Sequence, residues 1–398
     1  VQTCALRSKD KRMKITYKIN VYNLLTYLLV FAIIKPYFLP AGLRQASKII
    51  ILISVFLFTI SREKKERIVN LSWLFSGCVL LSAVMAYLKG GYQDKDFLDA
   101  LLYAVTFYDI YSFIGLCKQK DRFNETIKCL YNIVGLYCIL TIVSILLVGT
   151  VNNSNQPAYI FGNKFTSSYL FIFFVALYGA THEMILWKNK ICYIALFISS
   201  IALTLYIGCA TGTVTLAVLF IATIVPFQKI RMLLLNERFA VTALIMSALV
   251  VLVMGQILKN EFVNNIVFGY FNRSYTVTGR LEIYNDYLLN IIRSRFWFGY
   301  GYSNSMMKNM TGLYANAQNG LFEIMVNMGF LSVVSLIVTV FWSFKNTLKT
   351  DKSFYISIIV YGMIIASIFE VALNWFFFLG VCLIRWNCDA DGSIRSSD

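Results

Sequence analysis

The most regular feature of the chain is a series of long apolar runs separated by short polar segments. A helix needs about 20 mostly apolar residues to cross a bilayer, because it rises by about 1.5 Å per residue. Runs of roughly this length recur along most of the sequence and lie at residues 21–41, 71–88, 97–117, 129–149, 166–187, 239–257 and 320–344. The pattern therefore predicts an all-α polytopic membrane protein.

Three other apolar blocks complete this layout. Residues 191–228 contain no charged side chain and are long enough for two spans joined by a turn at residues 208–212. Residues 49–60 are short for one span, and we expect the aliphatic stems of the basic residues before them to extend it. Residues 354–386 fit two short spans with a turn near Glu370. The expected total is about twelve spans.

The basic residues predict how these spans are oriented. Short cytoplasmic segments of membrane proteins collect Lys and Arg. If the N-terminus is cytoplasmic, about two thirds of the 36 Lys and Arg residues fall on the cytoplasmic side, and both termini lie there. The polar start and the full-length first span are not typical of a cleaved signal peptide. The expected segments are a cytoplasmic tail at 1–20, spans at 21–257, an outer loop at 258–319, spans at 320–386 and a cytoplasmic tail at 387–398.

The outer loop is the one segment that offers room for a functional site. It carries six basic and three acidic residues, a net charge of +3, which suits an anionic ligand at the membrane surface. An amphipathic helical pattern begins at Gly279, a possible N-cap, with Glu282 at the third helical position. We expect its apolar face to lie at the membrane interface. Arg280, in the first turn beside free backbone amides, is then a candidate phosphate ligand.

Composition excludes several other classes of protein. With 58% hydrophobic and 14% charged residues, the chain is not a soluble enzyme. It has a single histidine, His182, so zinc sites and Ser-His or Cys-His catalytic pairs are disfavoured. The nine cysteines lack CxxC spacing and are interpreted as small hydrophobic residues. We expect no metal, no cofactor and no nucleic-acid partner.

Three motifs of the loop region carry a resemblance to a known family. They are TGRLEIY at 278–284, FWFGYGYSN at 296–304 and AQNGLFEIMVNMGFLSV at 317–333. In this combination the chain resembles the O-antigen polymerase and ligase family, which includes Wzy-type polysaccharide polymerases. FGNKFTSSY at 161–169 and IGCATGTVT at 207–215 fit the family more loosely. The resemblance implies a GT-C-like architecture in a bacterial cytoplasmic membrane.

Two positions depart from the family pattern. Ligases of the family usually have histidine where this chain has Gln318, and an arginine is common where it has Thr213. His182 is expected near the cytoplasmic end of its span, away from an outer site. A mechanism that depends on imidazole is therefore disfavoured, and the resemblance favours a polymerase over a ligase.

The resemblance implies transfer of a growing saccharide from undecaprenyl pyrophosphate to a new lipid-linked repeat unit. Implied partners are this lipid-linked oligosaccharide and the bilayer, with a chain-length regulator and a flippase as further candidates. Candidate catalytic residues are Arg280 for the pyrophosphate and Glu282, Asp286 or Glu323 for the proton of the attacking hydroxyl. Candidate substrate-binding residues are Arg273, Lys164, Gln318, Asn319, Tyr284, Tyr300 and Tyr302.

Simpler roles remain open for several of these residues. Arg280 could only anchor the loop at the interface, and Asn319 is a strong N-cap for the span that follows it. A ligase that attaches finished polymer to an acceptor is the alternative enzyme. A non-enzymatic flippase or transporter is the second alternative, although the sequence shows no inverted repeat.

Overall fold

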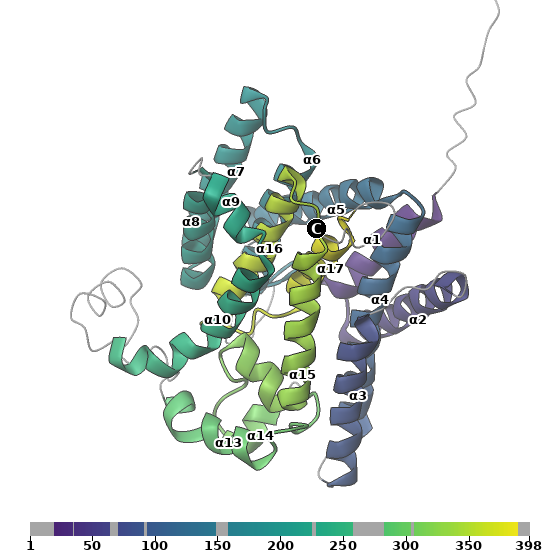
Figure 1. Ribbon diagram of the computed structural model, residues 1–398, viewed down its shortest axis with the longest axis vertical. Helices are drawn as coiled ribbons and strands as arrows, with labels where there is room; N and C mark the ends of the chain where they lie inside the picture. Colours follow the sequence, from purple (N-terminus) through teal and green to yellow (C-terminus); the bar gives the residue numbers. More distant parts are fainter. Residues whose placement is uncertain are drawn as a thin grey trace, which may run out of the picture.

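The computed structural model describes residues 20–34, 36–63, 71–90, 94–148, 158–224, 228–257, 282–303 and 306–388 (Figure 1). Almost all of these residues that form regular structure are helical. One small hairpin, β1 (Ala158–Tyr159) with β2 (Gly162–Asn163), departs from the all-α prediction. The hairpin ends at Asn163, which is the N-cap of the next helix, so the hairpin positions the start of that helix.

Most of the long helices follow the apolar runs, but the first predicted span, 21–41, is helical only over residues 21–33 before the next helix begins at Ala41. The helices before the outer loop are α1 (Val21–Ile33), α2 (Ala41–Glu63), α3 (Ser72–Leu88), α4 (Asp94–Gln119), α5 (Phe123–Val143) continued by the π-helix η1 (Ser144–Val148), α6 (Lys164–Thr181), α7 (Trp187–Tyr206), α8 (Ala210–Ile224), α9 (Gln228–Leu234) and α10 (Glu237–Ile257). Those after its start are η2 (Ile283–Leu288), α13 (Leu289–Ser294), α14 (Met306–Thr311), α15 (Gly320–Lys345), α16 (Asp351–Ala366) and α17 (Trp375–Trp386).

Both turns predicted within apolar blocks are confirmed. Helices α7 and α8 are separated at residues 207–209, where Gly208 adopts a φ of 66°. Helices α16 and α17 are separated at residues 367–374, which include Glu370. The turns lie where a Gly pair and a lone carboxylate interrupt otherwise apolar sequence, so hydropathy alone could locate them.

The helices make this a polytopic membrane protein. Within the described parts of the chain, α2, α4, α5 with η1, α7 and α15 are long and apolar enough to cross a bilayer, and α9 with α10 forms a further candidate span bent by 71°. Helices α1, α3, α8 and α17 are apolar but shorter. The expected total of twelve spans therefore stays a prediction, because several of its members are too short to cross alone.

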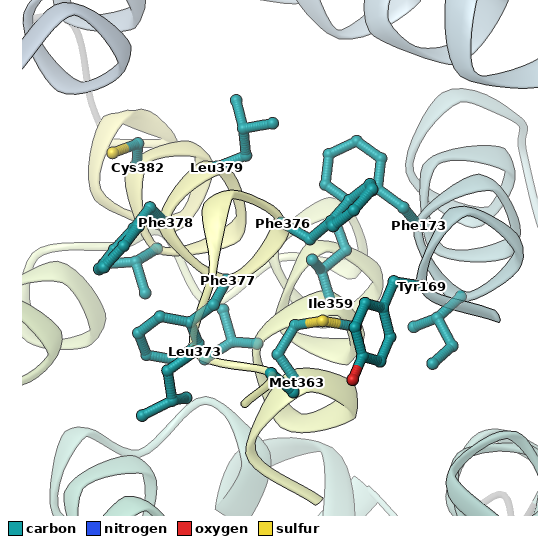
Figure 2. Packing of buried hydrophobic residues seen from close by; sticks show 14 of the residues in the cluster. Tyr169, Phe173, Ile359, Met363, Leu373, Phe376, Phe377, Phe378, Leu379 and Cys382 are labelled. Carbon is teal, nitrogen blue, oxygen red and sulfur yellow. The ribbon is translucent and has the colours of Figure 1, made fainter. Parts of the chain in front are cut away.

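Burial separates lipid-facing helices from interior ones. Only 22% of the apolar window of α2 and of α7 is buried, whereas 89% of that of α4 is buried. Helix α17 is enclosed almost entirely, by α4, α15 and α16. Figure 2 shows Phe376 of α17 directed toward Tyr169 and Phe173 of α6. A helix of 12 residues can lie in the centre because its neighbours, rather than lipid, cover its sides.

Helix α15 is interrupted at Gly329, which has φ 78° and ψ 176°. The break releases backbone groups that the segment before α14 satisfies: Tyr300 N–H donates to the Val326 carbonyl at 3.0 Å, and Phe330 N–H donates to the Phe296 carbonyl at 2.8 Å. Gly299, with φ 65°, lies against the break. The two glycine motifs of the sequence, FWFGYG and NMGF, are thus one packed unit.

Candidate functional site

The turn before α15 is the most firmly held part of the candidate site. Asn319 is fully buried, and its side-chain oxygen accepts from Leu321 N–H at 3.1 Å and Phe322 N–H at 3.0 Å. Its amide donates to the Ser247 carbonyl of α10 at 2.9 Å. Asn319 is therefore the N-cap of α15 and a link between two helices. Asn319 has this structural role in the described structure, and its contact with a sugar remains a prediction.

Gln318 adopts a left-handed backbone conformation, with φ 53°. Its N–H donates to the Asn316 side chain at 2.9 Å, and its carbonyl accepts from the Tyr284 hydroxyl at 2.9 Å. Both backbone groups are thus bound within the protein, while the side chain is partly exposed. The turn presents the Gln318 side chain at the place where the resemblance implies a functional residue.

Glu323 lies in the first turn of α15 and braces the same turn. One carboxylate oxygen accepts from Ala317 N–H at 2.7 Å, and the other accepts from the Asn327 amide at 2.8 Å. A carboxylate at a helix N-terminus is also favoured by the helix dipole. Each oxygen retains a second lone pair, so Glu323 can accept a further proton or hydrogen bond.

The predicted amphipathic helix is confirmed over its described residues. Residues 282–294 are continuously helical as η2 and α13. Ile283, Tyr284 and Leu288 are at most 3% exposed and Ile291 and Ile292 are 8% exposed, whereas Leu289, on another face, is exposed. The expectation that this face lies at the membrane interface is wrong. The face packs within the protein core, partly against α15, and the fold rather than lipid positions the helix.

Glu282 begins this helical stretch and is exposed. One of its carboxylate oxygens accepts from the Tyr314 hydroxyl at 2.5 Å. Tyr314 therefore links the start of the amphipathic helix to the segment between α14 and α15. Of the two predicted carboxylates whose side chains the structure describes, Glu282 is exposed, whereas Glu323 is partly buried.

Tyr300 is held by side chains at the end of α13. Its hydroxyl bonds to Ser294, and the guanidinium of Arg295 lies 4.7 Å from its ring centroid. These contacts hold the tyrosine against the end of α13, and a cation over one face of a ring competes with a sugar for that face. A substrate role for Tyr300 stays a prediction.

Tyr302 belongs to a group of aromatic side chains that sequence analysis did not predict. Its ring lies 4.3 Å from that of Tyr103 on α4, and Tyr103 lies 4.6 Å from Trp375 at the start of α17. The ammonium of Lys48 on α2 lies 5.7 Å from the Trp375 ring. We call Tyr103, Tyr302 and Trp375 the aromatic row. Its members lie about 200 and 70 residues apart in sequence, so no local motif reveals them.

Acidic side chains lie beside the aromatic row. Burial, and then the charges of Asp99 and Glu323, raise the pKa of Tyr302, whose hydroxyl therefore stays protonated and able to donate. Ser303 donates to Asp96 on α4 at 2.7 Å, which fixes the segment after Tyr302. Sequence reasoning missed Asp96 and Asp99 because they lie in a separate short segment, although acidic residues at a predicted outer helix end were a usable signal.

Lys164 lies in a neighbouring polar group. It opens α6, and its ammonium donates to the Gly208 carbonyl at 3.2 Å, in the turn between α7 and α8. Both Lys164 and Glu370 act electrostatically on Cys209. The turn that contains Glu370 also bonds to the start of α15, through Gly320 N–H and the Ser367 carbonyl at 3.0 Å. Lys164 is thus on the same end of the bundle as Glu323.

Some predicted residues lie beyond what the structure describes. Arg273 and Arg280 fall outside the described residues, and Asp286 is described only as part of the backbone of η2. The structure does place the next described residue after Arg280, Glu282, beside the turn at Gln318 through η2 and Tyr314. Their roles stay predictions.

The described residues contain no group of three or more His, Cys, Asp and Glu side chains that could hold a metal ion. His182 ends α6, with its ring stacked on Tyr178 at 4.1 Å between centroids. That place is at the opposite end of α6 from Lys164. The described candidate side chains at the site end are carboxylates, amides, aromatic rings and a lysine.

The fold and the site together define a multi-pass membrane protein with a polar and aromatic site at one end of its helices. Residues 194–337, just over a third of the chain, match the family model described as O-antigen ligase. The chain therefore contains an O-antigen ligase family domain, and the resemblance carried by its motifs is confirmed over this segment. The family comprises O-antigen ligases and polymerases, membrane enzymes of polysaccharide biosynthesis. No curated protein and no solved structure matches the chain.

Proposed function

We propose that the protein is a polymerase of lipid-linked oligosaccharide repeat units, acting on the outer face of a bacterial cytoplasmic membrane. The observation that carries the proposal is the convergence of the family motifs on one turn. There the Tyr284 hydroxyl donates to the Gln318 carbonyl and Glu323 accepts from the adjacent Ala317 N–H, all within the segment that matches the O-antigen ligase family.

The proposed reaction needs little acid catalysis at the leaving group. The hydroxyl oxygen of the acceptor sugar attacks the anomeric carbon of the donor chain, and the bond from that carbon to the pyrophosphate oxygen breaks. Undecaprenyl pyrophosphate leaves with its charge already in place, so fixed cations stabilise it more than a proton donor does. Arg280 is assigned to this pyrophosphate, with Arg273 or Lys164 as a second cation.

The proton of the attacking hydroxyl passes to a carboxylate. We assign this role to Glu282, because it is exposed and because Tyr314 holds one of its oxygens. Glu323 is assigned a positioning role, since both of its oxygens brace the turn before α15. Asp286 remains the alternative proton acceptor.

The aromatic row is the proposed platform for the acceptor sugar. Aromatic side chains present flat apolar faces with polar tips, which suits the mixed surface of a sugar ring. Tyr302 adds a hydroxyl that stays protonated, because burial and the charge of Asp99 raise its pKa. The Gln318 side chain supplies a neutral amide where an imidazole is usual in ligases.

A deletion experiment in the native host tests the proposal. Loss of a polymerase leaves single repeat units on the carrier lipid, whereas loss of a ligase leaves long chains that are not attached to an acceptor. The lipid-linked pool is extracted, and its chain lengths are compared between wild type, the deletion and Arg280→Ala. Single units in the deletion and in the variant, with normal membrane levels of the variant protein, support a polymerase.

A ligase is the second candidate, because the matching family model is described as O-antigen ligase. It predicts long unattached chains in the same deletion strain. A flippase or transporter predicts instead that lipid-linked units accumulate on the cytoplasmic side, where an added membrane-impermeant periodate reagent does not oxidise them in intact cells. The three outcomes are therefore distinct.

A further inference from the structure

A cavity of about 360 Å³ lies at the opposite end of the helices from the candidate site. Helix α4 runs from Asp96, which bonds to Ser303, to Lys118, which lines the cavity. Helix α15 likewise runs from the capped turn at Asn319 toward Leu348, another lining residue. Asp96 and Lys118 are 22 residues apart on α4, which places the two ends about 33 Å from each other. The cavity is therefore independent of the proposed reaction.

The cavity is lined by the corner between α4 and α5 and by the corner between α15 and α16, with a residue after α17. Its lining residues are Lys118, Asp121, Phe123, Asn124, Leu348, Thr350, Lys352 and Asn387. Polar side chains and two ammonium groups thus surround a space whose volume lies within the range of small-molecule sites. We call it the basic cavity.

Among the residues that the structure describes, the basic charges around this cavity exceed the acidic charges that could pair with them. Lys118 and Lys128 both repel the charge of Lys352. Two acidic residues nearby pair with arginines instead: Glu125 binds Arg122 at 2.8 Å, and Asp351 binds Arg231. Asp121 is the one acidic residue in the lining. Within this described part of the chain, three lysines lie near one another without an equal number of unpaired carboxylates, and such like-charge repulsion is relieved when an anion binds.

Hydrogen bonds hold the walls of the cavity in place. The ammonium of Lys352 donates to the Asn124 side chain at 2.6 Å, which joins the two corners. Asn387 donates to Ser353 at 2.6 Å, and its carbonyl accepts from Leu348 N–H at 2.9 Å. An ammonium has three donors, so Lys352 can bind an anion while it keeps Asn124. The cavity is thus built by contacts between distant parts of the chain.

We propose that the basic cavity binds the phosphate of an acidic phospholipid headgroup. Basic pockets between membrane helices suit anionic headgroups, because lysines there are already at headgroup depth and the acyl chains remain in the bilayer. Thr350 and Asn124 supply polar groups for the glycerol part of such a headgroup. The same phosphate chemistry is available from free inorganic phosphate, which the experiment distinguishes from the lipid.

The test uses the purified full-length protein in a neutral detergent, after delipidation. Native mass spectrometry measures retention of phosphatidylglycerol, of phosphatidylcholine and of inorganic phosphate. We expect selective retention of phosphatidylglycerol, weakened about 25-fold in the Lys118→Gln, Lys352→Gln double variant, since each lysine near a membrane surface contributes a factor of about five. The Lys188→Gln, Lys190→Gln double variant removes the same charge from exposed positions at the start of α7 and is the matched control.

A second variant, expected to strengthen lipid binding, distinguishes a specific effect on binding from a general loss of folding. Asp121→Asn removes the acidic lining residue and should tighten phosphatidylglycerol binding. Retention of inorganic phosphate alone, equal retention of both lipids, or equal weakening in the two double variants would overturn the proposal. So would an Asp121→Asn variant that binds the lipid more weakly than wild type while it remains monodisperse.

Discussion

The substitution Gly329→Ala tests the packed unit formed by the two glycine motifs. Gly329 has φ 78° and ψ 176°, a backbone region that is essentially restricted to glycine and costs other residues about 1–3 kcal/mol. A Cβ at this position would lie 2.4 Å from the Trp297 carbonyl oxygen and 2.6 Å from Gly299 N. Both neighbours are backbone atoms, so neither can rotate away.

Relief of this clash requires the segment 296–300 to move from the break in α15. Overpacking in a closely packed region costs about 1–3 kcal/mol. Together with the backbone term, the expected loss is about 2–6 kcal/mol of folding free energy. The movement also breaks the bonds from Tyr300 N–H to Val326 and from Phe330 N–H to Phe296, which leaves the helix break unsatisfied.

Gly77→Ala is the matched control, because Gly77 is an exposed residue of α3 with no atom within 4 Å of an added Cβ. Alanine there should be neutral or stabilise α3 by up to about 1 kcal/mol. Thermal unfolding of the two variants in detergent, followed by fluorescence-detected size-exclusion chromatography, gives the comparison. If Gly329→Ala unfolds at the same temperature as Gly77→Ala, the packed unit does not support α15 as described.

Three further substitutions test other parts of the site. Asn319→Asp keeps the oxygen that caps α15 but loses the amide that donates to Ser247, so we expect a partial loss of thermal stability. Asn319→Ala loses both interactions and should lower the folding free energy by about 2–4 kcal/mol. Equal stability of the two variants would contradict a capping role. Tyr302→Phe keeps the aromatic row and should retain most of the polymerisation rate, whereas Tyr302→Ala should lower that rate at least about tenfold. Chain-length profiles measure both rates, and a fully active Tyr302→Ala variant would show that the aromatic row does not bind the acceptor sugar. Glu282→Gln should lower the rate of chain extension about 100-fold or more with unchanged protein levels, and an unchanged rate would transfer the proton-accepting role to Asp286.

Hydropathy and turn residues were sufficient to predict the helices and both internal turns. Each apolar run contains a helix, because a chain in lipid must satisfy its backbone groups internally, although the helix of the run 21–41 ends at Ile33. Helix length was less predictable. Helix α17 has 12 residues although its apolar block suggested a span, because enclosure by other helices removes the need to cross the bilayer alone.

The amphipathic helix shows what hydrophobic periodicity cannot predict, namely which surroundings cover the apolar face. Its apolar face was visible in the sequence, but a face of this kind suits lipid and protein equally well. The structure buries Tyr284 and Leu288 in the protein and directs the Tyr284 hydroxyl to the Gln318 carbonyl. A contact between residues 34 apart depends on how the loop folds back, which the local pattern does not contain.

The candidate site was predictable only where it is local in sequence. The motif around Gln318 and Glu323 lies within a few residues, so its importance was evident before the contacts were known. The aromatic row combines Tyr103, Tyr302 and Trp375 from three distant segments. Tyr103 and Trp375 read as ordinary aromatic residues of a membrane protein, and only packing of α4 against α17 brings them to Tyr302.

Reconstitution tests the central claim most directly. The purified protein in liposomes is supplied with one undecaprenyl pyrophosphate-linked repeat unit and no other acceptor, and the products are resolved by length. A polymerase predicts a ladder of lipid-linked chains with release of undecaprenyl pyrophosphate, lost in Arg280→Ala and retained in Gly77→Ala. A substrate that stays a single unit with the wild-type protein, yet is transferred when a separate lipid acceptor is added, would contradict the account and identify a ligase.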